Sequence, residues 1–399
     1  MCASLTHTAP SSTSFASPGI SQPTWMESPQ GTVVQIQGNT LINMGANNYL
    51  GWTHHPRLVK AVQEAAFTWG VGAGAVRPIN GTLQPHIALD RAIATFYNAE
   101  AALAFQSGFA ANLAVIPAVA KAGSIIYSDA WNHPSLFDAC HLAVAQASVT
   151  HKIYPHSDLN TLKAWLSEKP RHQDALIITN GVFSMDGDLA LLPELVQLAR
   201  RYNAQILVDD AHGTGVMGQH GRGTVDAFHL SHEIDILVGS FSKALGSVGG
   251  FVVCSQAICQ QMLANAHPYL FSTALPPTVV ACNQQTLRLL QEEPEHQAQL
   301  WQNTRYFSRK LNEIGFSHQS QSPIQPIYIG EESLALALHE RLHQAGVLAP
   351  VLVAPTVPQG AARLRLIVTA HHRQAQLDTV LAILEKEARA LGILAAKRV

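Results

Sequence analysis

Residues 205–212 read Gln-Ile-Leu-Val-Asp-Asp-Ala-His, and this stretch decides the fold. The short apolar run Gln205–Val208 predicts a buried strand, and the carboxylate of Asp209 follows directly where the strand would end. Similar runs alternate with helical patterns on both sides, which is typical of a mainly parallel sheet in an α/β fold. These runs are Ala102–Phe105, Ser124–Tyr127, Leu176–Thr179 and Ile236–Val238.

Helical patterns precede and follow residues 205–212. Pro193 suits a first helical turn, and Leu195, Leu198, Ala199 and Tyr202 follow with the spacing of one apolar stripe. The last third changes character: it predicts a Gln-rich helix around 283–314, a Pro-rich passage at 350–358 and a final helix. That helix would bury Leu377, Val380, Leu381, Leu384 and Ala388. We therefore expect a smaller α+β domain after the sheet.

Composition limits the partners. The chain has 399 residues, of which 47% are hydrophobic, and its formal net charge of −2 shows no basic stripe for nucleic acid or an anionic membrane. No stretch is long and apolar enough for a membrane span, and residues 1–24 lack the basic and apolar regions of a signal peptide. We expect a cytoplasmic protein that binds small molecules, with an N-terminal arm that is mobile or docks on another subunit.

Cysteine and histidine usage gives no metal signal. The five cysteines are scattered without CxxC pairing, which fits a reducing compartment. Twenty histidines include no HExxH or equivalent spacing, so we predict no metal. The pairs His54/His55 and His371/His372 are interpreted as loop or helix-entry residues.

Polar residues follow several of the predicted strands. Ligands of parallel sheets bind at the carboxyl ends of the strands, so these positions are considered together. Residues 106–112 form a small-residue turn before a helix, suited to a phosphate or simply to the turn geometry. Asp209 and His212 are either site residues or a helix cap with a satisfied histidine. Lys243 lies among hydroxyls and glycines without an adjacent acid, and a desolvated lysine of this kind attacks aldehydes readily.

At these residues the sequence resembles the α-oxoamine synthases, a family of fold-type-I pyridoxal-phosphate enzymes. The resemblance runs from about Asn47 to His371. It is carried by 47–51 (NNYLG), 77–82 (RPINGT) with His86, 107–112 (SGFAAN), Asp129 with 132–133 (NH), 182–188 (VFSMDGD), 208–215 (VDDAHGTG), 221–223 (GRG), 239–250 (GSFSKALGSVGG), 271–273 (FST) and 355–358 (PTVP) before 363–365 (RLR).

The resemblance implies the architecture and the cofactor. A large pyridoxal-phosphate-binding domain with a seven-stranded, mainly parallel sheet would span residues 53–285. An N-terminal arm and segment would cover residues 1–52, and a smaller C-terminal α+β domain would cover residues 286–399. A homodimer with shared active sites is implied as well.

The resemblance also implies residue roles. Lys243 would bind the cofactor aldehyde and act as the base, and Asp209 would pair with the ring nitrogen. His133 would stack on the ring, while Ser184 and His212 would hydrogen-bond the ring hydroxyl oxygen. The phosphate would contact the backbone of Gly108 and Phe109 beside Ser107, then Ser240, and Ser272 or Thr273 from the second subunit. Arg365 would clamp the amino-acid carboxylate near Asn47.

The implied reaction joins a small amino acid to an acyl thioester of CoA or an acyl-carrier protein, with loss of carbon dioxide. Residues 355–360 and 362–365 resemble the 8-amino-7-oxononanoate synthases, whereas 74–77 and 81–82 are closer to 2-amino-3-ketobutyrate CoA ligases. A serine palmitoyltransferase-like activity, another fold-type-I aminotransferase or decarboxylase, and a non-catalytic binding protein remain as alternatives. Pro134 after the histidine departs from the usual pattern.

Overall fold

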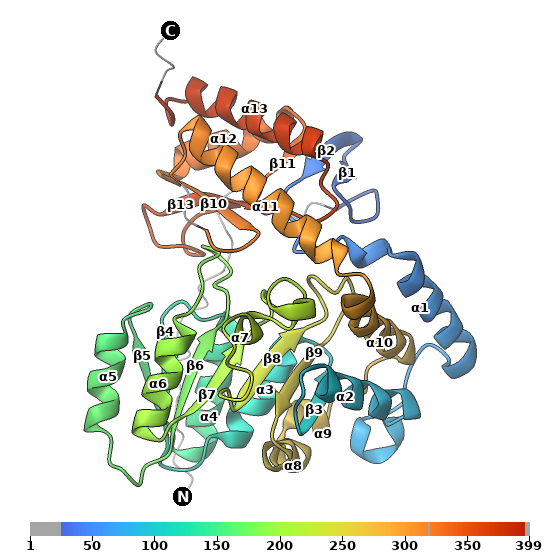
Figure 1. The fold of residues 1–399 in the computed structure, drawn as a ribbon, viewed down its shortest axis with the longest axis vertical. Coiled ribbons are helices and arrows are strands. Elements are labelled where there is room, and N and C mark those ends of the chain that lie inside the picture. Colours follow the sequence, from blue (N-terminus) through green and yellow to red (C-terminus); the bar gives the residue numbers. More distant parts are fainter. Residues whose placement is uncertain (1–24, 318–319, 396–399) are drawn as a thin grey trace, which may run out of the picture.

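The computed structural model describes residues 25–317 and 320–395, and its core is one seven-stranded sheet (Figure 1). The strand order is β3-β9-β8-β7-β6-β4-β5, with β9 antiparallel to both neighbours and the other pairs parallel. The α/β fold with a mainly parallel sheet is therefore confirmed. The strands are β3 (Ala101–Phe105), β4 (Ile125–Asp129), β5 (Thr150–Tyr154), β6 (Ala175–Asn180), β7 (Gln205–Asp209), β8 (Ile236–Ser240) and β9 (Gly250–Cys254).

Both faces of the sheet are buried, which is why its strands, apart from the edge strand β5, are mainly apolar. Within β3, Ala102 and Ala104 pack on one face, while Leu103 and Phe105 pack on the other, as the period of two requires. One face is covered by α2 (Gln84–Phe96), α5 (Leu159–Glu168), α6 (Leu192–Tyr202) and α10 (Pro277–Glu292). The other is covered by α3 (Gly108–Val119), α4 (Pro134–Ala147) and α8 (Gln256–Asn265).

The predicted helix at Pro193 is confirmed as α6. Leu195 and Ala199 are buried, and Leu198 and Tyr202 are partly buried against the same core. The remaining helices of the large domain are η1 (Trp52–His54), α1 (Pro56–Trp69), η2 (Arg77–Gly81), η3 (Gln219–Gly221), α7 (Thr224–Ala227) and α9 (His267–Leu270).

The smaller domain lies beyond the carboxyl ends of the parallel strands (Figure 1). Its antiparallel sheet has the order β10-β13-β12 and is covered by α11, α12 and α13, so the predicted α+β character is confirmed. The five residues predicted for the face of the final helix are all buried. The elements are α11 (Glu295–Ile314), β10 (Ile324–Gly330), α12 (Glu332–Gln344), β11 (Val347–Leu348), β12 (Val351–Leu352), β13 (Ala362–Ile367) and α13 (Gln374–Ala390).

The expected single helix over 283–314 is wrong. The structure has two helices there, α10 and α11, which are separated at Glu293 and Pro294. Proline has no backbone N–H to continue a helix, and Glu293 leaves the helical region at φ −126° and ψ 59°. The break lets α11 leave the large domain and cross to the smaller one (Figure 1).

The N-terminal segment contributes strands to the smaller domain. β1 (Val33–Ile36) pairs with β2 (Asn39–Asn43), and β2 pairs with β11 in parallel. The boundaries at residues 52 and 285 stay predictions. The predicted N-terminal arm, residues 1–24, lies outside the described residues. In the described part of the chain, we find no helix with the length and hydropathy to cross a membrane.

Candidate active site

Asp209 is the last residue of β7 and lies buried at the carboxyl end of the sheet. Its carboxylate accepts hydrogen bonds from Asn112 Nδ2 at 2.7 Å and from the backbone N–H of Ala211 at 3.1 Å. Asn112 comes from α3, and its amide also donates to Ser135 Oγ at 2.9 Å. The carboxylate is thereby fixed in one orientation at the strand end.

Lys243 follows the neighbouring strand β8 and interacts electrostatically with Asp209. Burial lowers the pKa of the Lys243 ammonium below its usual range; the carboxylate of Asp209 opposes this shift, and the guanidinium of Arg365 adds to it. The amine therefore loses its proton more readily than an exposed lysine, which makes it a better nucleophile and base.

The histidines His133 and His212 complete this cluster. His133 caps the start of α4, and its backbone N–H donates to Asn180 Oδ1 at 2.8 Å. Burial lowers its pKa, with Asp209 opposing and Lys243 adding to the shift. His212 is buried, and burial together with the charges of Lys243 and Arg365 holds its pKa well below the usual range. Both imidazoles are therefore neutral near pH 7.

Tyr49 has a place in the site that the sequence reasoning did not assign. Its hydroxyl lies 2.8 Å from Nδ1 of His212, although the two residues are 163 positions apart. Burial raises the pKa of Tyr49 to about 12, so the hydroxyl keeps its proton. Tyr49 and Asn112 both stand inside the motifs at 47–51 and 107–112. The two motifs mark these residues as candidates for the site. Their positions in the sequence do not indicate which side chains come into contact.

A phosphate-sized anion fits the start of α3. Ser107 caps this helix by accepting from the N–H of Ala110 at 3.0 Å. Within the described part of the chain, the N–H groups of Gly108 and Phe109 have no hydrogen-bond partner and can bind an anion. Ser240 lies next to Gly108: a Cβ on that glycine would be 3.7 Å from the Cβ of Ser240. A Cβ on Gly250 would come within 2.3 Å of the Gly108 nitrogen, so only glycine fits behind this turn.

Ser272 and Thr273 lie close to the same turn within one chain. Gln106 Nε2 donates to the carbonyl of Thr273 at 2.6 Å, and Thr273 also bridges to Val76. Their predicted contribution from a second subunit stays a prediction.

Arg365 extends from β13 of the smaller domain toward the sheet. Its two terminal nitrogens each lie 3.2 Å from Oδ1 of Asn47, and its Nε donates to the carbonyl of Ser184. Among the described residues, no carboxylate pairs with it. Burial lowers the pKa of Arg365, but a guanidinium stays charged at any ordinary pH. The structure thus places Asn47 beside Arg365, as expected, and adds the carbonyl of Ser184, a contact that was not expected. The planar cation is available to bind a carboxylate.

The donor set fits pyridoxal phosphate. A buried amine for an aldehyde, a buried carboxylate for a ring nitrogen and a helix start with an adjacent hydroxyl for a phosphate all lie at one end of the sheet. Lys243, Asp209 and Ser240 with Gly108 supply these three groups.

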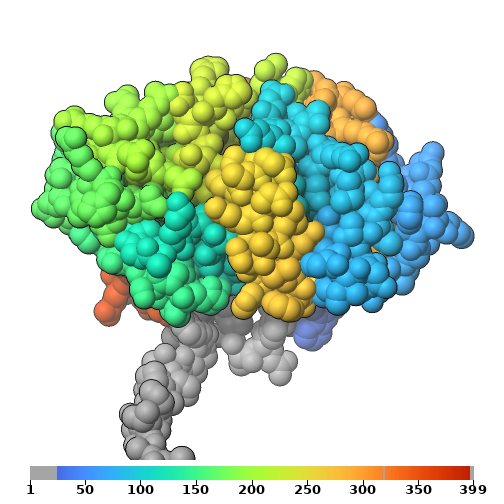
Figure 2. All heavy atoms as spheres, turned by 90° about the horizontal axis from the view of Figure 1, so that it is seen from below, coloured from blue at the N-terminus to red at the C-terminus, as the bar shows by residue number. Residues whose placement is uncertain are grey.

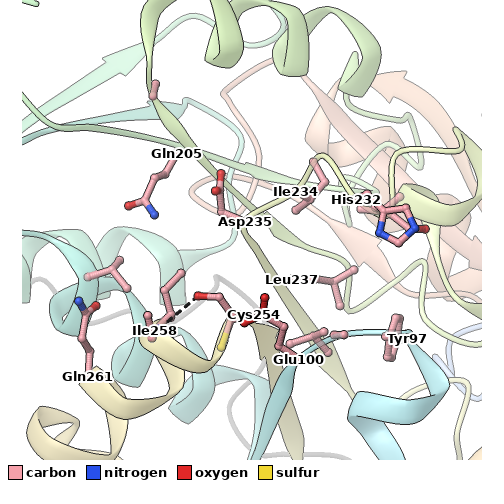
Figure 3. A pocket seen from close by; sticks show the side chains of 18 of the residues that line it. Tyr97, Glu100, Gln205, His232, Ile234, Asp235, Leu237, Cys254, Ile258 and Gln261 are labelled. Atoms are coloured by element: carbon pink, nitrogen blue, oxygen red, sulfur yellow. Dashed lines mark hydrogen bonds between the residues drawn. The ribbon is translucent and has the colours of Figure 1, made fainter.

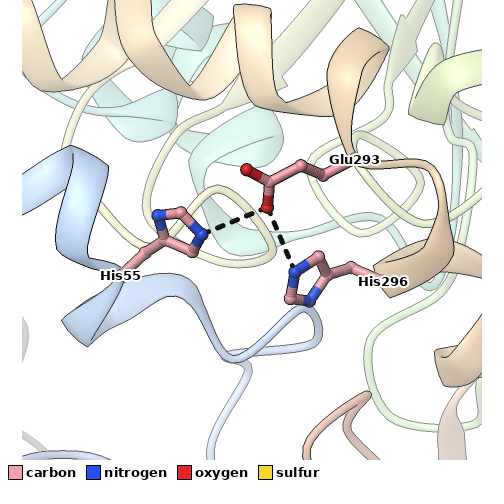
Figure 4. Close-up of side chains that lie close together, drawn as sticks. All are labelled: His55, Glu293 and His296. Carbon is pink, nitrogen blue, oxygen red and sulfur yellow. Dashed lines mark hydrogen bonds and ion pairs between the residues drawn. The ribbon is translucent and has the colours of Figure 1, made fainter.

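A second cluster of side chains lies where α1 begins and α10 ends (Figure 4). Nε2 of His55 and of His296 lie 3.2 and 3.3 Å from the same carboxylate oxygen of Glu293, within reach of one metal ion. However, Nδ1 of His55 accepts from the backbone N–H of Arg57, so a neutral ring carries its proton on Nε2. Arg57 also pairs with Glu293 at 3.0 Å. The cluster is an ion-pair network at the entry to α1, in line with the interpretation of His55 as a helix-entry residue.

A cavity of about 640 Å³ lies at the opposite end of the sheet (Figure 3). It is lined by Gln205 at the start of β7, by Asp235 before β8 and by Cys254 at the end of the antiparallel β9. None of the predicted site residues lines it. Because ligands of parallel sheets bind at the carboxyl ends of the strands, the cluster around Lys243 is the better candidate.

Comparisons with known proteins identify the family of this chain. The family described as aminotransferase class I and II matches residues 39–384. An 8-amino-7-oxononanoate synthase from Thermoanaerobacter pseudethanolicus is 47% identical over 373 residues, which covers 93% of each chain. A solved structure of SPT with PLP has a TM-score of 0.89 and 33% identity, covering 93% of this chain and 94% of the other.

A crystal structure of 8-amino-7-oxononanoate synthase from Francisella tularensis has a TM-score of 0.76 and 27% identity, covering 88% of this chain and 98% of the other. The resemblance that the motifs indicated is therefore confirmed. The chain belongs to the aminotransferase class I and II family and, within it, to the α-oxoamine synthases, which are pyridoxal-phosphate-dependent acyltransferases.

Proposed function

We propose that this protein is an 8-amino-7-oxononanoate synthase, which condenses L-alanine with a pimeloyl thioester and releases carbon dioxide and the thiol. The observation that carries the reaction type is the buried Lys243 amine, which lies within electrostatic range of Asp209 and of the Arg365 guanidinium. Among the described residues, that guanidinium has no carboxylate partner. The substrate pair is supported by relatives of that name at 41–47% identity, each covering at least 89% of this chain.

The proposed roles start with binding. Pyridoxal phosphate supplies an aldehyde for the amino group and a ring that accepts the electrons released at the α-carbon. Asp209 would keep the ring nitrogen protonated, and the hydrogen bonds from Asn112 and from the Ala211 N–H hold its carboxylate in one orientation. Ser240 and the N–H groups of Gly108 and Phe109 would hold the phosphate.

The remaining groups orient the substrate and move the proton. Arg365 binds the amino-acid carboxylate through its planar fork, with Asn47 aligning the guanidinium. The neutral ring of His133 would stack on the cofactor, and Ser184 and His212 would hydrogen-bond its hydroxyl oxygen. Nζ of Lys243, with its lowered pKa, removes the α-proton and returns a proton after carbon dioxide has left.

A second candidate is a serine palmitoyltransferase-like or aminoketobutyrate ligase-like reaction at the same site. Serine palmitoyltransferase is favoured by structural similarity, with a TM-score of 0.87 for the Sphingomonas wittichii enzyme. Alanine, glycine and serine should each be incubated with pimeloyl-CoA, acetyl-CoA and palmitoyl-CoA, with free thiol and product mass as readouts. We expect turnover to be highest for alanine with pimeloyl-CoA. An aminotransferase would release no thiol with any pair.

We propose that the protein works as a homodimer. Large apolar side chains are exposed on neighbouring segments of one face: Phe67 (95%), Val71 (80%), Ile79 (79%) and Phe271 (73%). Water-exposed side chains of this size are typical of a subunit interface. Figure 2 shows this side of the large domain, with the segment around α9 in gold beside residues of about 56–82 in blue.

Phe271 precedes Ser272 and Thr273, so the same interface would complete the phosphate site. Light scattering should give twice the chain mass for the wild type and a lower mass for Phe271→Asp. A monomeric, fully active wild type would contradict the shared site.

We also propose a cytoplasmic location. Cys140, Cys254, Cys259 and Cys282 are free and buried, as suits a reducing compartment. Cell fractionation would test this.

A further inference from the structure

The turn at residues 182–189 lies between the two domains next to the proposed site. Val182 and Leu189 bridge its two arms, and the N–H of Gly187 closes it by donating to the carbonyl of Phe183 at 2.8 Å. The turn contacts the smaller domain closely, since a Cβ on Gly187 would come within 2.7 Å of the carbonyl oxygen of Ile324.

Two arginines of β13 hold this turn. Arg363 and Arg365 are two positions apart and therefore point to the same side of the strand. Arg363 Nη1 forms an ion pair with Asp186, and Arg365 Nε donates to the carbonyl of Ser184. Their partners in the turn, Ser184 and Asp186, are likewise two positions apart, so two parallel contacts join the strand to the turn.

The ion pair is shielded from water. Arg363 is 4% exposed and Asp186 is 9% exposed. The hydroxyl of Tyr328 also donates to Asp186, and the guanidinium carbon of Arg363 lies 4.5 Å from the centre of the Tyr328 ring. Burial and the carboxylate of Asp186 raise the pKa of Tyr328 above its usual range, so the phenol remains a donor. Each partner of this pair would be left as an uncompensated buried group if the other were removed.

The other side of the turn is fixed to the large domain. Asp188 Oδ2 lies 2.9 Å from Nε2 of His156, and Nδ1 of the same ring lies 2.9 Å from Asp129 at the end of β4. The turn is thus a rigid support on which the position of β13, and hence of Arg365, depends.

We propose that Asp186 and Arg363 are positioning residues that hold Arg365 where it receives the amino-acid carboxylate. This inference rests on the proposed function. Among the described residues, Arg365 has only neutral hydrogen-bond partners, namely the Asn47 side chain, the Ser184 carbonyl and the Tyr49 hydroxyl, which leave its charge available but align it weakly. The ion pair of Arg363 with Asp186, two residues along β13, fixes the strand and thereby the position of Arg365.

The test uses Asp186→Asn in the cofactor-loaded enzyme, with L-alanine as the probe in calorimetry and in steady-state assays. We expect the alanine dissociation constant and the KM for alanine to rise about tenfold, because the guanidinium of Arg365 shifts when Arg363 loses its partner. The KM for the acyl thioester should stay within about twofold. Asp174→Asn, in an exposed pair with Lys121 at 3.0 Å, is the matched control and should change neither constant.

The double variant Asp186→Asn with Arg363→Met separates positioning from folding. It removes both buried charges, so it should melt close to the wild type and yet retain the raised alanine dissociation constant. It also takes the place of Asp186→Asn if that single variant does not fold. An unchanged alanine dissociation constant in a folded variant would overturn the inference.

Failure of the proposed function has a different signature. In that case the wild type itself binds no alanine, glycine or serine, and Arg365→Gln makes no difference. A wild type that binds alanine, an Arg365→Gln variant that does not and an Asp186→Asn variant that binds as well as the wild type would reject only the positioning role.

Discussion

His156 gives a pH-dependent contribution to stability whose size follows from its surroundings. Its ring lies between two carboxylates, Asp129 and Asp188, at 2.9 Å each, and stacks on Trp131 with ring centres 3.9 Å apart. Burial alone would lower its pKa, but the hydrogen bonds to the two carboxylates outweigh burial and raise the pKa of His156 from 6.5 to about 9. The protonated ring is therefore stabilised in the folded state.

The shift converts into a free energy of unfolding. One pKa unit corresponds to about 1.4 kcal/mol, so a shift of this size contributes about 3 kcal/mol. The His156 side chain is 15% exposed and that of Asp188 is 31% exposed, which allows some solvent screening. We therefore expect about 2–3 kcal/mol. Because the folded-state pKa lies above the unfolded value of 6.5, this stability is fully present below pH 6.5 and is lost as the pH rises through about 9.

The perturbation is His156→Gln, which keeps a polar side chain but cannot carry the charge. Urea unfolding of wild type and variant should be compared at fixed protein and cofactor concentrations from about pH 6 to about pH 10. The difference in unfolding free energy should be largest at the acidic end and shrink by about 2–3 kcal/mol toward the alkaline end. His172→Gln, at an exposed turn position, is the control. A difference that stays constant with pH, or grows with it, would refute the reasoning.

Three further predictions concern the site and its support. Arg365→Lys should raise the KM for alanine at least tenfold with a smaller effect on the acyl thioester, because an ammonium cannot match two carboxylate oxygens; equal effects on both substrates in steady-state assays would contradict the clamp. Asp209→Asn should lower kcat by about a hundredfold or more while the protein still binds the cofactor, since an amide does not keep the ring nitrogen protonated; near-normal kcat would be incompatible with that pairing. Gly213→Ala should destabilise the protein by about 1–3 kcal/mol in thermal melts, since its Cβ would lie 2.0 Å from Oδ1 of the buried Asp210; an unchanged melting temperature would argue against this tight packing.

The sequence allowed the sheet and the centre of the site to be predicted for one physical reason. Buried parallel strands are continuous apolar runs, and their ends are marked by the first polar residues, as at Asp209 and at Ser240 before Lys243. Five of the seven strands were predicted in this way. β5 was missed because its exposed edge breaks the apolar pattern: Thr150 is exposed and Lys152 remains polar.

Two features could not be predicted: the direction of each strand, and the contacts between side chains that lie far apart in the sequence. β9 is as apolar as its neighbours, so nothing in its residues distinguishes an antiparallel strand from a parallel one. The contacts of His212 with Tyr49 and of Asp209 with Asn112 join residues 163 and 97 positions apart. Such pairs depend on how the helices and loops pack, which no local pattern reports. The same holds for His156, whose two carboxylate partners come from the end of β4 and from the turn at residues 182–189.

The central claim is that Lys243 carries the cofactor, and its most direct test is chemical trapping. The purified holoenzyme should be treated with borohydride, digested and analysed by mass spectrometry, with Lys243→Ala treated in parallel. We expect a phosphopyridoxyl group on Lys243 in the wild type, and in the variant no covalent label and no turnover. An unmodified Lys243, or a label on another lysine such as Lys121, would contradict the account.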